Sequence, residues 1–327
     1  MSKSAINRWL GALLAAALAG AAAMPAAAQE YPNRPLRLVV PYPPGASTDM
    51  LGRMVGQKVS QAFGQPVVVD NRGGASGNIG SEFVARAPAD GYTFMVGTDA
   101  THASNMHLAA APTFHPVRDF TPLVGAVGNP IVLVVHPSVP VKTMRELIDY
   151  GRVNPSKISY GSSGAGSPHH LAGELLKQTT GVPFVHVPYR GGGPALNDVL
   201  GGQIPMVFAS LVTVLPHIKS GKLRALAVTQ GSRYPGLPDV PTVGETLPGF
   251  EMNSWLGFFA PAGLPEAQLK RLSDEIVKAL HDPEVREKIE SGGLTLMATG
   301  PAEFGAMVRR DFEQRGKLIP AAGIKPE

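Results

Sequence analysis

The feature that most constrains this chain is an alternation of short β-branched runs with segments of helical periodicity. Runs typical of strands stand at 37–42, 66–70, 92–97, 131–135, 157–161, 184–189, 205–210 and 223–228. Segments typical of helices lie between them, at 48–63, 143–153, 169–180 and 193–202. Parallel strands need crossover connections, which are usually helices. The alternation therefore predicts an α/β fold with mostly parallel sheets.

The last third of the chain reads as helix rather than strand. In the segment 265–282, Leu269, Leu272, Ile276 and Leu280 recur on one helical face. This spacing is that of a stripe packed on a core, and no functional meaning is attached to it. Helix starts are also marked: Ser47 or Thr48 is expected to cap the first helix.

The first 28 residues have the pattern of a secretory signal. Lys3 and Arg8 precede an Ala-rich apolar run, and the stretch AAAQ at 26–29 suits cleavage after the small residue Ala28. The alternative is a membrane anchor, which the weak hydrophobicity of the run and Pro25 disfavour. We therefore predict a signal peptide over 1–28 and an exported mature chain.

Composition then bounds the mature protein. The 299 residues after the signal suggest about two domains. Loss of the signal lowers the formal charge from +4 to +2, which gives no indication of a nucleic-acid or membrane partner. The chain has no cysteine, which excludes a disulfide framework, a thiolate metal site and a cysteine nucleophile.

Three loops rich in small residues each precede a predicted helix. They are PPGAST (43–48), GSSGAGS (161–167) and YRGGGPA (189–195). A helix N-terminus has unpaired N–H groups and partial positive charge, so it favours anions. Glycine and alanine let a ligand approach the backbone, and the serine and threonine hydroxyls can donate. Open α/β sheets bind ligands at the carboxyl ends of their strands, where these loops lie.

The sequence does not match the residue spacing of two common enzyme motifs, the nucleophile elbow and the dinucleotide fingerprint. GSSGAG and GGASGN each miss the nucleophile elbow G-x-S-x-G by one residue. The stretch 75–80 lacks the first glycine of a dinucleotide fingerprint, so no nucleotide cofactor is expected. His169 and His170 are adjacent and point about 100° apart on a helix, which argues against a metal site and favours one packed and one exposed histidine. Asp49 could act as a base, but a carboxylate in a first helical turn is usually a cap.

Six blocks of the chain resemble one receptor family. YPNRPLRLVVPYPPGASTD, GQPVVVDNRGGASGNIGSEFVARAPADGYT, ISYGSSGAGSPHHLAGELL, VPYRGGGPALNDVLGGQI, GKLRALAVT and LPDVPTVGE stand in family order. The mature chain is similar to the Bug-type periplasmic solute receptors of tripartite tricarboxylate transporters. The resemblance implies a type II periplasmic-binding-protein fold: two α/β lobes joined by crossing strands, with a ligand cleft between them.

The resemblance also implies which residues bind ligand and where the lobes divide. The signal at 1–28 would be followed by lobe one, at 30–126 plus 257–327, and lobe two at 127–256, with the crossings near 126–135 and 254–261. The C-terminal helices would cover lobe one. The implied ligand-binding residues are Pro44, Gly45, Ala46, Ser47, Thr48, Asp49, Thr98, Gly161, Ser162, Ser163, Gly164, Ser167, Tyr189, Arg190 and Gly191. Ala46 stands where the family usually has a second glycine, and alanine adopts positive φ less readily.

These inferences predict a periplasmic, monomeric receptor that uses no cofactor, metal or catalytic residue. It would capture a small carboxylate by hinge closure and deliver it to membrane permease subunits. The loops specify an oxyanion but leave open a dicarboxylate, an amino acid or an aromatic acid. A subunit that signals to a membrane kinase, or an enzyme using the same cleft, are the alternatives.

Overall fold

The computed structural model describes residues 31–189 and 191–326. The predicted signal peptide at 1–28 and Arg190 lie outside these residues. Within the described part of the chain, no helix combines the length and apolar character needed to cross a membrane.

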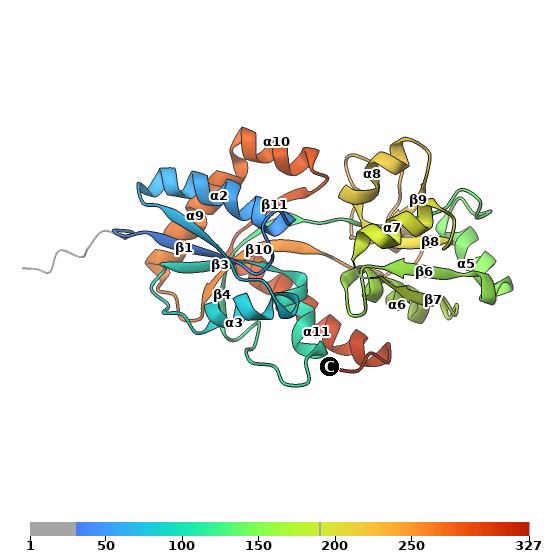
Figure 1. Cartoon of the computed structure of the whole chain (residues 1–327), viewed down its shortest axis with the longest axis horizontal. Coiled ribbons are helices and arrows are strands. Elements are labelled where there is room, and N and C mark those ends of the chain that lie inside the picture. The colour runs from blue at the N-terminus through green and yellow to red at the C-terminus, as the bar shows by residue number, and fades with distance from the viewer. Residues whose placement is uncertain (1–30, 190, 327) are drawn as a thin grey trace, which may run out of the picture. The chain divides into compact units, whose positions relative to one another are not determined.

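Two separate mixed sheets organise the chain (Figure 1). The first has the strand order β11-β4-β10-β3-β1-β2 and the second β7-β6-β8-β5-β9. The strands of the first sheet are β1 (Leu36–Val40), β2 (Val67–Asn71), β3 (Thr93–Thr98), β4 (Phe120–Gly128), β10 (Trp255–Pro261) and β11 (Thr295–Thr299). Those of the second are β5 (Ile131–Val135), β6 (Ser159–Ser162), β7 (Val185–Pro188), β8 (Met206–Ser210) and β9 (Arg224–Val228).

Helices follow most of the strands. Along the segments that carry the first sheet they are α2 (Ser47–Phe63), α3 (Asn78–Ala85), α4 (Asn105–Leu108), α9 (Glu266–His281), α10 (Pro283–Ser291) and α11 (Pro301–Ala321). Those between the strands of the second sheet are α5 (Met144–Val153), α6 (Pro168–Thr180), α7 (Gly192–Leu200) and α8 (Leu211–Lys219). Short turns complete the set: 3-10 helices η1 (Ala75–Gly77), η3 (Pro155–Lys157) and η4 (Val243–Glu245), and a π-helical turn, η2 (Ala100–Ser104).

Each sheet is covered on both faces because its strands are apolar on both faces. In β5, Ile131, Leu133 and Val135 belong to one core cluster and Val132 and Val134 to another. Such alternation follows from the two-residue period of a strand, and uninterrupted apolar runs mark strands buried on both sides. In the first sheet α2 and α9 cover one face and α3 and part of α11 the other (Figure 1).

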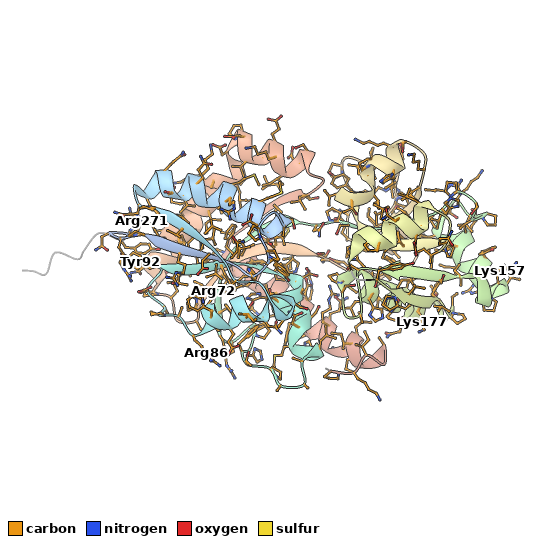
Figure 2. The ribbon with its side chains drawn as sticks, viewed as in Figure 1. Arg72, Arg86, Tyr92, Lys157, Lys177 and Arg271 are labelled. Atoms are coloured by element: carbon orange, nitrogen blue, oxygen red, sulfur yellow. The ribbon has the colours of Figure 1, made fainter. Side chains whose placement is uncertain are left out.

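Two contacts show how the first of these faces is held. Leu272, Ile276 and Leu280 of the predicted stripe on α9 are buried in the core beside α2. At the rim of the same face, the guanidinium of Arg271 lies 5.5 Å from the ring centre of Phe63 (Figure 2).

The α/β prediction is confirmed, but the expectation of mostly parallel sheets is wrong. The eight predicted strands are present to within two residues, β10 was expected only as a crossing near 254–261, and β4 and β11 were not predicted as strands. β10 runs antiparallel to both β3 and β4, and β5 runs antiparallel to both β8 and β9. These reversals arise because β5 and β10 carry the chain from one sheet into the other and so enter from the opposite direction to their neighbours.

The crossings also decide where the loops lie. The chain leaves the first sheet at Gly128, at the carboxyl end of β4, and both β4 and β3 oppose β10. The carboxyl ends of β1 and β3 are therefore at this exit edge. In the second sheet β8 opposes the entering β5, and β6 and β7 run parallel to β8. The N-termini of α2, α6 and α7 thus follow strand ends at the two edges that the chain itself connects.

Helix α11 contributes to both parts of the molecule. Near its start, Phe304 and Val308 pack in the core of the first sheet with Trp255 and Phe259. Near its end, Leu318 and Ile319 join the core cluster of the second sheet. The C-terminal helix therefore does not rest on the first sheet alone.

The central strand β10 depends on a close approach at Gly257. A Cβ atom there would overlap Phe304 Cζ and lie 2.9 Å from Val124 O. Gly257→Ala should therefore lower the free energy of unfolding by about 2 to 3 kcal/mol, as overpacking of a full core does. Urea unfolding measures this. Gly300→Ala is the matched control, because nothing lies within 4 Å of that added atom; equal stability of the two variants would contradict the packing.

Candidate functional site

Loop 43–49 brings an uncapped helix N-terminus to the end of β1. The N-cap residue of α2 is Ala46, which has no side-chain capping bond, so the expected cap at Ser47 or Thr48 is wrong. The first helical bond runs from Met50 N–H to Ala46 O at 2.9 Å. The N–H groups of the turn before it are left for another partner.

The backbone of this loop is unstrained at Ala46. Gly45 supplies the positive φ, +85°, and a Cβ atom there would meet nothing within 4 Å. Ala46 has φ −69° and ψ 159°, an extended conformation open to any residue. The alanine that stands where the family usually has glycine therefore costs no conformational strain. Pro44, Gly45 and Ser47 are exposed beside it.

Asp49 fastens the loop rather than facing solvent, being 3% exposed. Its carboxylate accepts hydrogen bonds from Gly45 N–H (2.9 Å), Arg53 Nε (3.0 Å) and Asn71 Nδ2 (2.9 Å). Burial alone would raise the pKa of Asp49, but these donors outweigh it and lower the pKa to about 2. The carboxylate is thus occupied as a clamp on the first turn of α2.

Thr48 differs from Asp49 in having no partner. Its side chain is 3% exposed, and its hydroxyl makes no hydrogen bond to any described residue. A buried hydroxyl left unpaired costs about 1 to 3 kcal/mol, so such groups usually meet a ligand or water. In loop 43–49, the unpaired hydroxyl of Thr48 is therefore the side-chain group that most directly indicates a bound ligand or water.

Thr98, at the end of β3, joins the same part of the first sheet through Tyr42. Its hydroxyl lies 3.3 Å from Tyr42 Oη and accepts from Thr101 N–H at 3.1 Å. Asn71 Nδ2 in turn donates to Tyr42 O at 3.1 Å. The structure therefore brings Thr98 and Asp49 into one network, and the Thr98 hydroxyl is already engaged within it.

In loop 161–167 the serines have different tasks. Ser162 is fully buried, and its hydroxyl lies 2.7 Å from His186 Nε2 and 3.1 Å from both the N and O of Gly164. Ser167 caps α6 by accepting from His170 N–H at 3.2 Å, and it donates to Gly164 O at 2.7 Å. Both side chains hold the loop, with Gly164 at φ +128°.

Two stacked histidines, His170 and His186, contact loop 161–167 and hold its backbone in place. The rings of His170 and His186 have centres 3.7 Å apart, and His170 Nδ1 accepts from Gly166 N–H at 3.0 Å. Burial lowers the pKa of each to about 4. His170 Nε2 lies 3.9 Å from Glu174, whose other carboxylate oxygen pairs with Lys177 at 3.2 Å; Lys177 is labelled in Figure 2.

Ser163 is hydrogen-bonded to His169, the histidine that precedes His170 in the sequence. Its Oγ lies 2.7 Å from His169 Nδ1, and His169 Nε2 lies 3.3 Å from Ser210 Oγ. The ring of His169 is half-buried, so the expectation of one packed and one exposed histidine is wrong: neither is exposed. Burial lowers the pKa of His169 to about 4.

A third helix N-terminus, that of α7, adjoins this loop. Gly191 caps α7 with no side-chain bond at φ +107°, and nothing lies within 4 Å of a Cβ atom added there or on Gly192. Gly191 N–H donates to Ser163 O at 3.2 Å, and Tyr189 N–H to Ser162 O at 3.3 Å. The Tyr189 phenol donates to Asp198 at 2.6 Å, so its hydroxyl is occupied.

The predicted residues therefore form two groups. One comprises the first-sheet residues of loop 43–49 with Thr98, and the other the second-sheet residues Gly161 to Ser167 with Tyr189 and Gly191. No hydrogen bond or ion pair between described residues joins the two groups. The lobes nevertheless touch close by, because a Cβ atom on Gly166 would lie 2.6 Å from Leu108 Cδ1.

Sequence reasoning missed a strained loop beside that contact. Gly74, Ala75, Ser76 and Gly77 all have positive φ, and for alanine and serine this is unusual. Asn105 Nδ2 holds the loop by donating to Ser76 O at 2.9 Å. A cavity of about 370 Å³ lies between this loop, Leu108 and Gly166. The glycines of this loop were read only as a failed nucleophile elbow and a failed nucleotide fingerprint.

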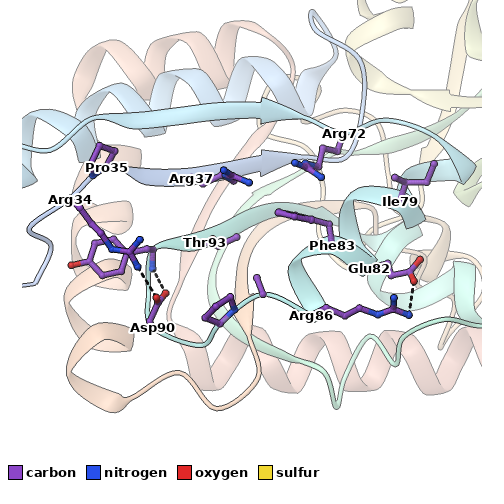
Figure 3. Close-up of a pocket in the computed structure, with 13 residues that line it drawn as sticks. Arg34, Pro35, Arg37, Arg72, Ile79, Glu82, Phe83, Arg86, Asp90 and Thr93 are labelled. Carbon is purple, nitrogen blue, oxygen red and sulfur yellow. Dashed lines mark hydrogen bonds and ion pairs between the residues drawn. The ribbon is translucent and has the colours of Figure 1, made fainter.

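A larger groove, of about 650 Å³, lies elsewhere on the first sheet (Figure 3). It begins where β1 and β3 start, at the edge opposite the helix N-termini. Its arginines already contact carboxylates: Arg34 with Asp90 at 2.9 Å, Arg72 with Asp70 at 2.8 Å, and Arg86 with Glu82 at 2.7 Å. Because its positive charge is largely compensated, this groove is a weaker candidate for an anion.

The crossing segment before β10 is fixed by a buried ionic cluster. Arg315 of α11 is fully buried and donates to Asn253 O at 2.9 Å, and Trp255 Nε1 donates to Asp311 at 2.8 Å. Ser254 Oγ donates to Asp99 Oδ1 at 3.0 Å. Burial raises the pKa of Asp99 to about 6. None of these contacts could be foreseen, because each joins residues more than 50 positions apart.

Solved structures similar to this chain include periplasmic binding proteins. Periplasmic binding protein BugD is 34% identical, with a TM-score of 0.71 over 91% of this chain and all of that one. The R. palustris protein Rpa4515 with adipate is 36% identical, with a TM-score of 0.76 over 91% of this chain and all of that one. MatC from Rhodopseudomonas palustris with bound malate is 29% identical, with a TM-score of 0.72 over 88% of this chain and all of that one.

The family assignment follows from a match over most of the chain. Residues 51–324 match the tripartite tricarboxylate transporter family receptor, TctC. The chain belongs to this family of extracytoplasmic solute-binding receptors, which are not enzymes. The type II periplasmic-binding-protein fold and the Bug-type resemblance expected from sequence are thereby confirmed.

The buried histidines generate a prediction about pH. Burial lowers the pKa of His102 to about 3 and those of His169, His170 and His186 to about 4, against about 6.5 in an unfolded chain. Between pH 6.5 and 4 the unfolded chain binds more protons, so the free energy of unfolding should fall as pH falls, by about 1.4 kcal/mol per histidine per pH unit. Asp99, with its raised pKa, opposes one of these contributions.

Urea unfolding at pH 7.5, 6.0 and 5.0 measures this dependence. His102→Phe should reduce the pH dependence of the free energy of unfolding by the contribution of one histidine. The phenyl ring should be tolerated, because the His102 ring already stacks on Phe259 with ring centres 3.8 Å apart. His281→Gln, at an exposed histidine, is the control. The same unfolding midpoint at all three pH values would contradict the buried, neutral state of these rings.

Proposed function

We propose that this chain is a periplasmic receptor that captures a small dicarboxylate between its lobes and delivers it to membrane permease subunits. The receptor acts as a monomer after removal of residues 1–28. Two kinds of support bear on the ligand: membership of a tricarboxylate-transporter receptor family, and relatives solved with adipate and with malate.

The observation that carries the proposal is the unsatisfied N-terminus of α2. Its N-cap has no side chain that accepts from the first turn, Gly45 leaves open space, and the buried Thr48 hydroxyl has no partner among the described residues. Unpaired N–H groups, a helix dipole and a free hydroxyl are together suited to a carboxylate. The Asp49 carboxylate repels a ligand carboxylate less, because it is paired with the Arg53 guanidinium and accepts hydrogen bonds from two further donors.

The second lobe supplies the complementary side. The N-terminus of α7 at Gly191 to Gly193 is open and has no side-chain cap, and Ser163 adjoins it through the Gly191 N–H. A dicarboxylate would place one carboxylate at α2 and the other at this end of the second sheet. In this proposal Ser162, Ser167 and Tyr189 shape the loops, since their hydroxyls are already bonded within the lobe.

Binding is tested first with the wild-type protein. Isothermal titration with adipate and malate should show saturable binding, and hexanoate, which lacks the second carboxylate, should bind more weakly. Thr48→Val should weaken adipate binding about tenfold, as expected for loss of one hydrogen bond to a charged group. The same variant should melt no lower than wild type, because the change removes a buried unpaired hydroxyl.

The matched control is Thr143→Val. Thr143 caps α5 by accepting from Glu146 N–H at 3.1 Å, so its loss should lower stability by about 1 kcal/mol and leave adipate affinity unchanged. Wild-type affinity in Thr48→Val would contradict the role of loop 43–49. Absence of binding for every dicarboxylate would contradict the proposal as a whole.

Capture by hinge closure makes a separate prediction. Contacts between lobes are made by Leu108 at Gly166 and by Val212 at Gly293, where an added Cβ atom would lie 3.0 Å from Val212 Cα. A ligand that bridges the lobes favours the state in which these contacts form. Small-angle scattering should therefore show a smaller radius of gyration with adipate. Leu108→Asp should lessen this change, and an unchanged profile at saturation would refute closure.

A further inference from the structure

A line of polar side chains connects the first crossing segment to loop 161–167. Asn129, between β4 and β5, donates from Nδ2 to Ser210 Oγ at 3.3 Å. Ser210, at the end of β8, lies 3.3 Å from His169 Nε2, and His169 Nδ1 lies 2.7 Å from Ser163 Oγ. The four residues come from four different segments, so the line is a product of the fold.

The amide of Asn129 fixes the direction of the first of these hydrogen bonds, and the tautomer of His169 sets the other two. An amide nitrogen can only donate, so Ser210 Oγ accepts from Asn129. A hydroxyl can accept twice, so both tautomers of His169 are compatible with this bond. In the arrangement we infer, Ser210 donates its own proton to His169 Nε2. Burial lowers the pKa of the His169 imidazole to about 4, so near pH 7 it carries a single proton. With Nε2 accepting, that proton is on Nδ1 and is donated to Ser163 Oγ.

The hydroxyl proton of Ser163 is consequently free. Ser163 Oγ accepts from His169, and residues 31–189 and 191–326 give it no other partner. We propose that Asn129, Ser210 and His169 form a hydrogen-bond relay that presents Ser163 as a donor to a ligand carboxylate. His169 is in this sense a positioning residue. The inference rests on the proposed function, because it assigns the second-lobe donor of that site.

The same geometry separates this pair from a nucleophile and base. A general base must accept the serine proton, whereas here the nitrogen that faces Ser163 is the protonated one. The other nitrogen faces the hydroxyl of Ser210, and no carboxylate among the residues that the structure describes is hydrogen-bonded to the ring. The serine–histidine contact therefore sets a donor for binding and does not activate an oxygen for attack.

The relay begins at the hinge. Asn129 N–H donates to Ser254 O of the other crossing segment at 2.8 Å, and Ser254 Oγ donates to the buried Asp99. A rotation at the crossing segments moves the Asn129 amide relative to Ser210, which belongs to the second sheet. The relay that leaves the Ser163 hydroxyl free to donate is therefore complete when the crossing segments have this arrangement.

The tautomer of His169 tests the relay without any ligand. Nitrogen-15 spectra of histidine-labelled protein at pH 7 distinguish a protonated Nδ1 from a protonated Nε2. We expect Nδ1–H in the wild type and loss of this preference in Ser210→Ala. A wild-type His169 protonated on Nε2 would overturn the proposal, because Ser163 would then donate to the ring.

A double-mutant cycle with adipate tests the effect on binding. Ser163→Ala should weaken binding about tenfold, and His169→Ala by a similar factor. If His169 acts through Ser163, the double variant should bind no more weakly than Ser163→Ala. His169→Asn, whose amide can donate from near the position of Nδ1, should recover most of the affinity. Additive losses would overturn the relay.

The two hypotheses fail in different ways. If the wild type binds neither adipate nor malate, the proposed function fails, and the His169 tautomer alone then decides the relay. If the wild type binds adipate but the cycle is additive, the receptor stands and the relay falls. Melting temperatures of all variants, compared with Thr143→Val, separate a loss of binding from a loss of fold.

Discussion

The two passages of the chain between its sheets are the constraint on which the rest of the structure depends. β4 leads out of the first sheet and β10 leads back into it, and the two strands pair side by side. Once their directions are set, the carboxyl ends of β1 and β3 must lie at the exit edge, and those of β6, β7 and β8 at the entry edge. The helices that follow these strands therefore begin at the connected edges of the two lobes.

In the proposed function, backbone groups at these edges bind the carboxylates of the ligand, while most side chains hold the backbone in place. Asp49 clamps the first turn of α2, and Ser162 and Ser167 brace loop 161–167. The stacked pair of His170 and His186 supports the same loop. This division of labour suits a receptor, because partial charges on amides are fixed in position and need no counter-charge that must itself be desolvated.

Local patterns in the sequence were sufficient for much of this architecture. β-branched runs located eight strands, and the small-residue loops were recognised because glycine and serine before a helix have a local physical meaning. β10 was seen only as a crossing, and the sheets were expected to be mostly parallel. Strand direction after a crossing depends on pairings such as Phe258 with Val124, which are remote in sequence. The contacts of His169 with Ser210 and of Arg315 with Asn253 were invisible for the same reason.

Helix α11 has a consequence for the independence of the second lobe. The strands of that lobe form one contiguous stretch of sequence, which would suggest a segment that can be cut out and studied alone. Its core, however, is completed by Leu318 and Ile319, nearly 60 residues beyond the return to β10. A fragment that ends before β10 would expose the apolar surface those side chains cover. The strands of the lobe are contiguous in sequence, but its core is not complete without the end of α11, so a shortened C-terminus would destabilise this lobe.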